Sequence, residues 1–368
     1  MPQLHERPLR LVPNRVYRSF PGGREIDRFR GIQPMTDNAC AEAWVGSATR
    51  NRMNPLQKTQ PDAPVDIRYG IAQVALDDGR TRYIDELFRD RPAAFLGERH
   101  ARQFSDNPGI LVKLLDAREQ LLLGAHPTRD VARAHFGSDF GKVESWYILN
   151  TRDDGPQKPY ILLGFKEGVT REAFAALYER QDIAAMDACC HRFEVAPGEM
   201  YYIAAGLPHA VGDGCFLLEV QEPTDWNVSV KRWWKPDDPR AESLQQRVMD
   251  CIDFTGRSRE ETLRQFRIEP EILCQTPEGT ESLLLGSRQT PYFSLTRLDV
   301  TGAFRETHRR AFHIAIVSEG SGELATSAGT LPLKRGDEIF LPAGVHEAVW
   351  KAGPEGLSVL RAHPQGVY

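Results

Sequence analysis

A strand, a turn and a histidine occur in the same order twice in this chain. The first copy, residues 197–209, reads PGEMYYIAAGLPH: a Pro-Gly turn, a short apolar strand, a turn at Gly206, and then His209. The second copy, residues 335–349, reads RGDEIFLPAGVHEAV. A histidine that follows a strand and a turn can be presented as a metal ligand at the mouth of a small β-barrel. The repeat therefore predicts two such barrels and makes metal binding the first functional question.

Composition limits the classes of protein to consider. The 368 residues are enough for two domains, and 41% hydrophobic with 26% charged residues is ordinary for a globular protein. The net charge of −5 indicates neither a nucleic-acid partner nor a membrane surface. No apolar run approaches 18 residues, and the N-terminus lacks the apolar core of a signal peptide. The six cysteines form no C-x-x-C pair, so we expect reduced thiols in a cytoplasmic protein.

Local patterns predict mostly strands. Short apolar runs between turns recur from Cys40 to Gln221, among them 120–125, and again from Ser282 to the end. Helical periodicity interrupts them over 83–103, 128–136, 170–190 and 241–266, with Thr128 and Thr170 as predicted N-caps.

These patterns predict a mainly β fold of two cupin (jelly-roll) barrels, with helical insertions in and after the first. We expect an N-terminal metal-binding domain over residues 1–240 and a helical bridge over residues 241–280. Residues 281–368 would form the C-terminal barrel domain.

Four residues of the first domain have side chains suited to metal chemistry: His126, Glu144, His209 and Glu219. Taken alone, a histidine at a strand end or a glutamate at a strand start is more often a structural or solvated residue. Together, in three turns of a repeated barrel, two imidazoles and a carboxylate predict a metal site at His126, Glu144 and His209. Such a set suits Zn²⁺, Fe²⁺, Co²⁺ or Mn²⁺.

The second barrel departs from this pattern. His346 follows its turn glycine by two residues, whereas His209 follows its own by three. Since side chains alternate along a strand, this shift turns His346 to the other face. His308 and His313, five residues apart, are also predicted on opposite faces. We therefore expect no metal in the C-terminal barrel.

Five segments, in order, carry a resemblance that covers most of the chain. They read PGGREIDRF (21–29), AEAWVGS (41–47), LVKLLDAREQLLLGAHP (111–127), FGKVESWYIL (140–149) and AAGLPHAVGDGCFLLEVQEPTDW (204–226). The last four are similar to the motifs "GESWEIS", "LFKILDAKEPLSIQVHP", "GKTEMWYIL" and "PAGTPHAIGEGVLLLEIQESSDT". The chain thus resembles the type I phosphomannose isomerases (mannose-6-phosphate isomerases), which are zinc-dependent proteins with two cupin domains.

The resemblance implies an aldose–ketose isomerase for a sugar phosphate of the mannose 6-phosphate/fructose 6-phosphate type. Matched by position, His126, Glu144 and His209 would bind the ion, which the family predicts to be Zn²⁺. Lys113, Lys142 and Glu219 would line the active site, with Glu219 as the proton shuttle, a role that Lys142 could share. The expected partner is a small sugar phosphate, with no nucleic acid or membrane, and the protein would be a monomer or a homodimer.

Two departures from the family pattern keep other functions open. Gly124 stands where the family has the glutamine of "QVH", and Ser229 where it has an arginine held to be catalytic. Lys231 or Arg232 could restore the positive charge, but not both if they lie on a strand. The alternatives are a non-haem Fe(II) oxygenase and a non-catalytic sugar-binding or regulatory protein. If these departures reduced isomerase activity, Gly124→Gln with Ser229→Arg should raise it.

Overall fold

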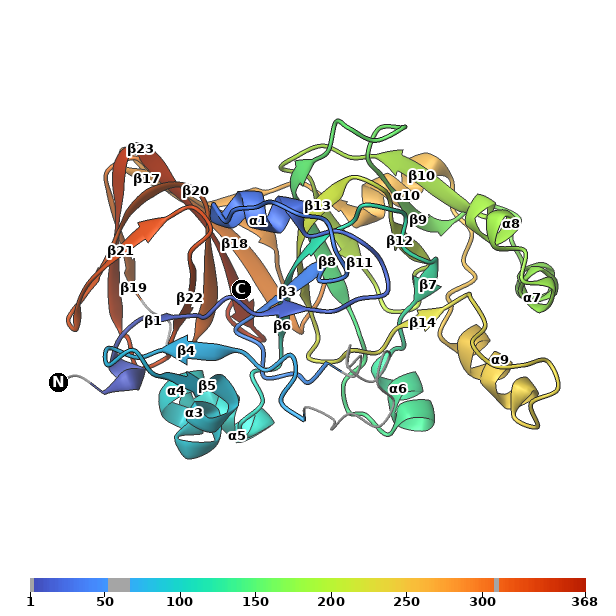
Figure 1. Cartoon of the computed structure of the whole chain (residues 1–368), viewed down its shortest axis with the longest axis horizontal. Helices are drawn as coiled ribbons and strands as arrows, with labels where there is room; N and C mark the ends of the chain where they lie inside the picture. Colours follow the sequence, from blue (N-terminus) through green and yellow to red (C-terminus); the bar gives the residue numbers. More distant parts are fainter. Residues whose placement is uncertain (1–2, 52–66, 308–310) are drawn as a thin grey trace. The chain divides into compact units, whose positions relative to one another are not determined.

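The computed structural model describes residues 3–51, 67–307 and 311–368, which fall into two compact units. Figure 1 labels their helices and strands. The first unit comprises Met1–Leu115, Leu218–Pro223 and Glu269–Tyr368, and the second comprises Asp116–Leu217 and Thr224–Ile268. The predicted domain boundaries at residues 240 and 280 stay a prediction.

An antiparallel nine-stranded sheet forms the barrel of the first unit, drawn mainly in orange and red in Figure 1. The strand order is β1-β22-β20-β23-β18-β17-β16, while β19 pairs with β23 and β21 with β20. The strands are β1 (Leu9–Arg10), β16 (Glu271–Thr276), β17 (Gly279–Leu285), β18 (Phe293–Val300), β19 (Ala303–Thr307), β20 (His313–Thr326), β21 (Gly329–Lys334), β22 (Glu338–Leu341) and β23 (Glu347–Pro364). No motif predicts that β1 joins this sheet, where Leu9 lies opposite Phe340.

Alternation along these strands builds the interior of the barrel. Ala315 and Val317 of β20 pack in one buried cluster with Leu357, Val359 and Trp350 of β23. Residues two apart on a strand share a face, so this face points into the barrel. Burying a valine or leucine side chain such as Val317 or Leu357 stabilises the fold by roughly 1.5–3 kcal/mol.

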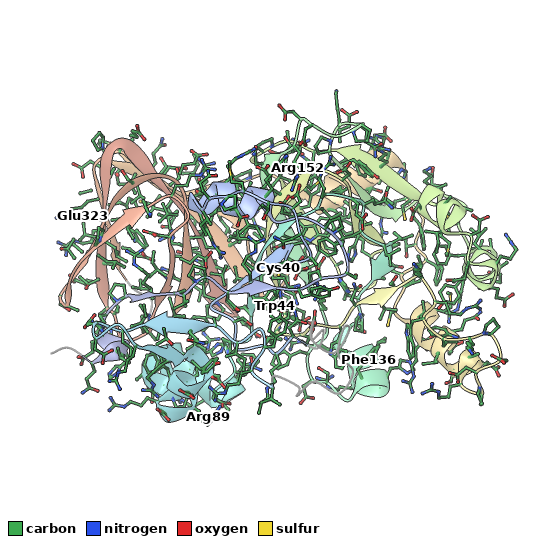
Figure 2. The ribbon with its side chains drawn as sticks, in the orientation of Figure 1. Cys40, Trp44, Arg89, Phe136, Arg152 and Glu323 are labelled. Atoms are coloured by element: carbon green, nitrogen blue, oxygen red, sulfur yellow. The ribbon has the colours of Figure 1, made fainter. Side chains whose placement is uncertain are left out.

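Three further strands of the first unit position a buried lysine. β2 (Arg15–Val16), β3 (Glu42–Val45) and β6 (Leu111–Asp116) pair antiparallel in that order. Trp44 of β3, labelled in Figure 2, is fully buried and lies opposite Lys113 of β6. A separate two-stranded sheet joins β4 (Gln73–Ala75) to β5 (Thr81–Tyr83).

The single helix predicted over residues 83–103 is wrong, because the chain breaks twice there. The first unit instead contains η1 (Leu4–Glu6), α1 (Arg24–Arg30), α3 (Ile84–Asp90), α4 (Pro92–Leu96) and α5 (Glu98–Phe104). Pro92 lacks a backbone N–H and disfavours helical geometry at Arg91, so α3 ends there. Gly97, with φ 97°, then separates α4 from α5.

The second unit contains a five-stranded sheet in the order β10-β9-β12-β7-β14. Its strands are β7 (Gly124–Ala125), β9 (Tyr160–Phe165), β10 (Cys190–Glu194), β12 (His209–Val211) and β14 (Val228–Ser229). In the same unit, β11 (Met200–Ile203) pairs with β8 (Glu144–Thr151) and with β15 (Arg267–Ile268). β13 (Cys215–Gln221) has residues in both units. The strand predicted over 120–125 is only the two residues of β7.

Helices of the second unit follow the predicted caps but are shorter than predicted. Thr128 and Thr170 cap α6 (Arg129–Phe136) and α7 (Arg171–Arg180), as expected. The predicted helix over 170–190 ends early because Gln181 adopts a left-handed conformation, with φ 53°. α8 (Ile183–Ala188) then starts anew, and the predicted helix over 241–266 is likewise divided into α9 (Ala241–Asp250) and α10 (Arg259–Phe266).

Among the residues described, no helix is both long and apolar enough to cross a bilayer. All six cysteines are free thiols, and Cys274 is exposed. His346 is exposed as well, whereas His313 is buried. His308, to which the sequence assigned a strand face, lies outside the described residues.

Candidate metal centre

Three strand ends of the second unit bring His126, Glu144 and His209 together. His126 directly follows β7, while Glu144 and His209 are the first residues of β8 and β12. β12 pairs with β7, which places His209 opposite Gly124. The Gly206 N–H donates to the His126 carbonyl oxygen at 2.8 Å and so ties the turn before His209 to His126. The predicted ligands, far apart in sequence, are neighbours in the fold.

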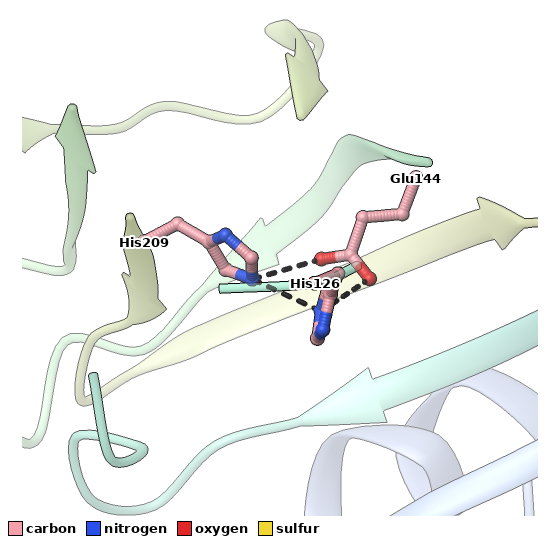
Figure 3. Close-up of side chains that lie close together, drawn as sticks. All are labelled: His126, Glu144 and His209. Carbon is pink, nitrogen blue, oxygen red and sulfur yellow. Dashed lines mark hydrogen bonds and ion pairs between the residues drawn. The ribbon is translucent and has the colours of Figure 1, made fainter. Parts of the chain in front are cut away.

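The potential ligand atoms of these residues converge at one point (Figure 3). His126 Nε2 lies 3.1 Å from Glu144 Oε2, and His209 Nε2 lies 3.4 Å from Glu144 Oε1. The two Nε2 atoms are 3.2 Å apart. Ligand atoms held tetrahedrally around an ion at roughly 2.0–2.1 Å are about 3.3 Å from one another. The spacing therefore fits a first-row divalent ion, as does the chemistry of two imidazoles and a carboxylate.

Hydrogen bonds determine which nitrogen of each imidazole carries the proton. His209 Nδ1 lies 2.7 Å from the Leu207 carbonyl oxygen, so Nδ1–H donates and Nε2 keeps its lone pair. Lys142 Nζ, which only donates, is 2.9 Å from His126 Nε2 and 2.9 Å from Glu144 Oε2. Nε2 is therefore unprotonated in both imidazoles, and its lone pair is available to a cation, which at His126 would replace Lys142 as the partner. No sequence motif predicts the role of the Leu207 carbonyl.

Burial and charge favour the protonation states of metal ligands. Burial, and then the charge of Lys142, lowers the pKa of His126 to about 3. Burial also lowers the pKa of His209. Burial raises the pKa of Glu144, but Lys142 and the imidazoles outweigh it and hold that pKa well below its usual range. The site therefore has neutral imidazoles and an anionic carboxylate near neutral pH, so binding an ion requires little proton release.

These lowered pKa values predict acid sensitivity of the metal-free protein. The unfolded chain takes up a proton on each histidine near the usual pKa of about 6.5, whereas the folded chain resists protonation of His126. Stability is thus lost as the pH falls, by about 2 kcal/mol for His126 between about pH 7 and pH 5. Urea unfolding of chelator-treated protein should show a drop larger by that amount than in His126→Gln. Equal drops in the two proteins would contradict the assignment.

Lys113 and Glu219 form a separate buried ion pair in the first unit. Lys113 Nζ donates to Glu219 Oε1 at 2.8 Å, and the residues are 2% and 3% exposed. The ammonium also lies 5.6 Å from the centre of the Trp44 ring. Each charge compensates the other, because an unpaired charge would be costly at this depth. The catalytic roles of Lys113, Glu219 and Lys142 stay predictions.

Comparison with known proteins connects this geometry to a family. Residues 287–349 match the family described as "Mannose-6-phosphate isomerase, cupin domain". Mannose-6-phosphate isomerase ManA of Bacillus subtilis is 25% identical over 282 residues, which cover 75% of this chain and 84% of that protein. The probable mannose-6-phosphate isomerase GmuF of the same organism is 26% identical over 307 residues, or 82% and 90% of the two chains. Over most of its length the chain is therefore similar to mannose-6-phosphate isomerases.

Solved structures of phosphomannose isomerases share the fold. The mannose 6-phosphate isomerase from Bacillus subtilis superposes with a TM-score of 0.72 at 21% identity, covering 97% of this chain and 99% of that one. A putative mannosephosphate isomerase from Archaeoglobus fulgidus gives a TM-score of 0.72 at 20% identity, covering 99% and 100%. The predicted mainly β fold of two cupin barrels with helical insertions is confirmed.

Gly124 and Ser229, the two positions that depart from the phosphomannose isomerase pattern, are neighbours in the fold. Gly124 of β7 lies opposite Ser229 of β14 on one side and opposite His209 of β12 on the other. A Cβ added at Gly124 would lie 2.7 Å from the Val228 carbonyl oxygen and 3.3 Å from Asn227 Oδ1. In this chain β14 therefore occupies the space into which the family's glutamine would extend. Sequence reasoning missed this, because no strand pattern marks a two-residue strand.

Lys231 and Arg232, considered as replacements for the family's arginine, both lie beyond β14 and on no strand. The two side chains are therefore not constrained to opposite faces of a strand. The backbone N–H of Lys231 donates to Ser229 Oγ, and its side chain is exposed. The Arg232 N–H donates to Gln181 Oε1 at 2.6 Å.

Because β14 lies so close to Gly124, we expect Gly124→Gln to destabilise the protein rather than to restore the family's glutamine ligand. The new Cβ would press on backbone, so we expect a loss of about 1–3 kcal/mol of unfolding free energy and lower metal content. Ser229→Ala is the matched control, because it alters the opposite residue without adding atoms. Urea unfolding and metal analysis of both variants measure the effect. A Gly124→Gln protein with unchanged stability and higher activity would contradict this expectation, because β14 would then have moved aside at little cost.

Proposed function

We propose that this protein is a metal-dependent aldose–ketose isomerase that interconverts mannose 6-phosphate and fructose 6-phosphate or a closely similar pair. Similarity to relatives that bear the name mannose-6-phosphate isomerase supports the reaction class. The observation that carries the proposal is the convergence of His126 Nε2, His209 Nε2 and the Glu144 carboxylate within 4.8 Å of one another.

His126, Glu144 and His209 would hold the ion, which we propose to be Zn²⁺. Their spacing suits tetrahedral coordination, with Fe²⁺, Co²⁺ and Mn²⁺ as the alternatives. When bound, the ion supplies positive charge that stabilises oxyanion character on the sugar during proton transfer. Gly124 supplies no side chain to the site, so three protein ligands leave a coordination position for substrate or water.

The isomerisation moves a proton between C2 and C1 of the sugar through an enediolate. We propose Glu219 as the base that takes the proton from C2 and returns it to C1. Lys113, bonded to Glu219 at 2.8 Å, would orient this carboxylate and favour its charged form. Lys142 Nζ, 2.9 Å from Glu144 Oε2, would hold this ligand in place. It is also the second candidate for moving the proton.

A coupled assay tests this proposal. Purified protein with its metal content measured should form fructose 6-phosphate from mannose 6-phosphate and should catalyse the reverse reaction. Free mannose and other hexose phosphates, run in parallel, define the substrate class. Absence of conversion in both directions by a fully metal-loaded, folded protein would refute the isomerase assignment. A cytoplasmic location and a monomeric or homodimeric state remain predictions, which cell fractionation and light scattering would test.

A further inference from the structure

The C-terminal barrel contains a polar cavity that the proposed isomerase mechanism does not use. Its volume is about 230 Å³, and Cys274, Glu281, Glu306, His313, His363 and Tyr368 are among its lining residues. All of these belong to the first unit, whereas the three proposed metal ligands belong to the second. The exposed thiol of Cys274 shows that the cavity has an edge open to solvent.

Strand alternation shows that polar side chains point into this barrel. On β20, His313 lies two positions before the interior residue Ala315. On β23, Arg361 and His363 lie two and four positions after the interior residue Val359. Residues at even spacing share a face of the strand. His313, Arg361 and His363 are 2%, 0% and 3% exposed. The interior is therefore apolar at one end of the barrel and polar at the end that carries the cavity.

The polar groups are held in place by one another. Arg361 contacts Glu281 at 2.8 Å and Glu306 at 3.0 Å. The Tyr368 hydroxyl donates to Glu281 Oε1 at 2.6 Å, and Trp350 Nε1 donates to Glu306 Oε2 at 2.7 Å. An ordered network of this kind keeps its donors and acceptors fixed before a ligand arrives, which reduces the entropy lost on binding.

The charges of this network disfavour an anionic ligand. Among the described residues, one guanidinium faces two carboxylates, so the balance at Arg361, Glu281 and Glu306 is negative when the imidazole of His313, 3.7 Å from Glu306, is neutral. Arg305, which also lines the cavity, is already paired with Glu347 at 3.0 Å. A phosphate placed here would therefore meet net repulsion, whereas hydroxyl groups could both donate to and accept from such residues.

Aromatic rings complete the lining. The rings of His313 and His363 meet edge to face at 5.2 Å, and those of His363 and Tyr368 at 5.0 Å. His363 Nε2 also bonds to Thr296 Oγ1 at 2.9 Å. Convergent polar groups among ring surfaces are typical of small-molecule sites. The cavity is smaller than the roughly 300–1,000 Å³ of sites for drug-sized ligands, which limits the ligand to a single small ring.

We propose that the C-terminal barrel binds a neutral polyhydroxylated molecule of about the size of one sugar ring. The site is distinct from the proposed metal centre and does not depend on the proposed isomerase function. The hydroxyl groups of an uncharged sugar would bond to Glu306, His313 and His363, while a sugar phosphate would be repelled by Glu281 and Glu306.

Cys274 provides a local reporter for this proposal. The full-length protein is treated with N-ethylmaleimide, and modification of the Cys274 peptide is followed by mass spectrometry with mannose, fructose or mannose 6-phosphate present. A neutral sugar at roughly ten times its Kd should slow labelling about tenfold, because bound protein is shielded. Mannose 6-phosphate at the same concentration should give no protection. Lack of protection by every neutral sugar, or equal protection by mannose 6-phosphate, would overturn the proposal.

Variants separate binding in the cavity from any indirect effect. His363→Phe keeps an aromatic ring but removes both nitrogens, so protection of Cys274 should disappear. Tyr368→Phe removes one hydroxyl near the C-terminus and should weaken binding about tenfold while leaving the fold intact. His346→Gln, which changes an exposed histidine of the same barrel, is the matched control and should behave as wild type. Full protection in both cavity variants would refute the site.

Discussion

Replacing His209 by alanine is expected to remove the metal and to lower isomerase turnover by roughly a thousandfold or more, because the ion's stabilisation of the oxyanion is lost. His209 Nε2 faces both Glu144 and His126, and its Nδ1 is anchored on the Leu207 carbonyl. No neighbouring side chain duplicates that nitrogen in the described site. Elemental analysis and steady-state kinetics on the same preparation measure both effects.

His135→Gln is the control for this substitution. His135 lies on α6 in the same unit, where its Nε2 is 3.1 Å from Asp250, and it takes no part in the proposed centre. We expect His135→Gln to keep one metal per chain and full turnover. A His209→Ala protein that retained its metal and its activity would remove His209 from the ligand set.

Glu219→Gln is expected to lower kcat about 10²–10⁴-fold while leaving the metal bound, because it deletes the proposed proton shuttle but no proposed ligand. The substitution also removes the carboxylate charge that Lys113 faces at 2.8 Å, which costs roughly 3–5 kcal/mol of stability. Kinetics must therefore be measured below the melting temperature of the variant, together with its metal content. Unchanged kcat in Glu219→Gln would exclude Glu219 as the shuttle.

Two further variants distinguish lost chemistry from lost stability. Lys113→Met combined with Glu219→Leu removes both charges, so stability should largely return while activity stays low. Asp116→Asn breaks another fully buried pair, in which Arg152 Nη2 lies 2.6 Å from Asp116 Oδ2 (Figure 2 labels Arg152). Asp116→Asn should lower the melting temperature without changing kcat of the folded protein. A large loss of kcat in Asp116→Asn would mean that instability alone explains the effect at Glu219.

The sequence was sufficient to predict that His126, Glu144 and His209 lie together, because each follows or begins a strand beside a recognisable turn. His126 precedes Pro127, Glu144 follows Gly141, and His209 follows the turn at Gly206. Local signals of this kind specify where a strand ends, and the repeated barrel motif specifies that the ends meet. The same reasoning found Thr128 and Thr170 as helix caps, since capping depends on a few adjacent residues.

Features that depend on tertiary pairing were not predictable in the same way. The approach of β14 to Gly124 involves a strand of only two residues, too short to show a period. The break at Gln181 has no glycine or proline to signal it. The polar end of the C-terminal barrel became visible only when His313 and Arg361, distant in sequence, were placed on inward faces of neighbouring strands.

The most direct test of the central claim is exchange of the C2 proton of mannose 6-phosphate with solvent deuterium, followed by NMR. We expect exchange in the metal-loaded protein, loss of exchange after chelation, and recovery when Zn²⁺ is returned. A metal-loaded, folded protein that leaves the C2 proton in place would contradict this expectation, as would exchange that continues at the same rate after the metal is removed.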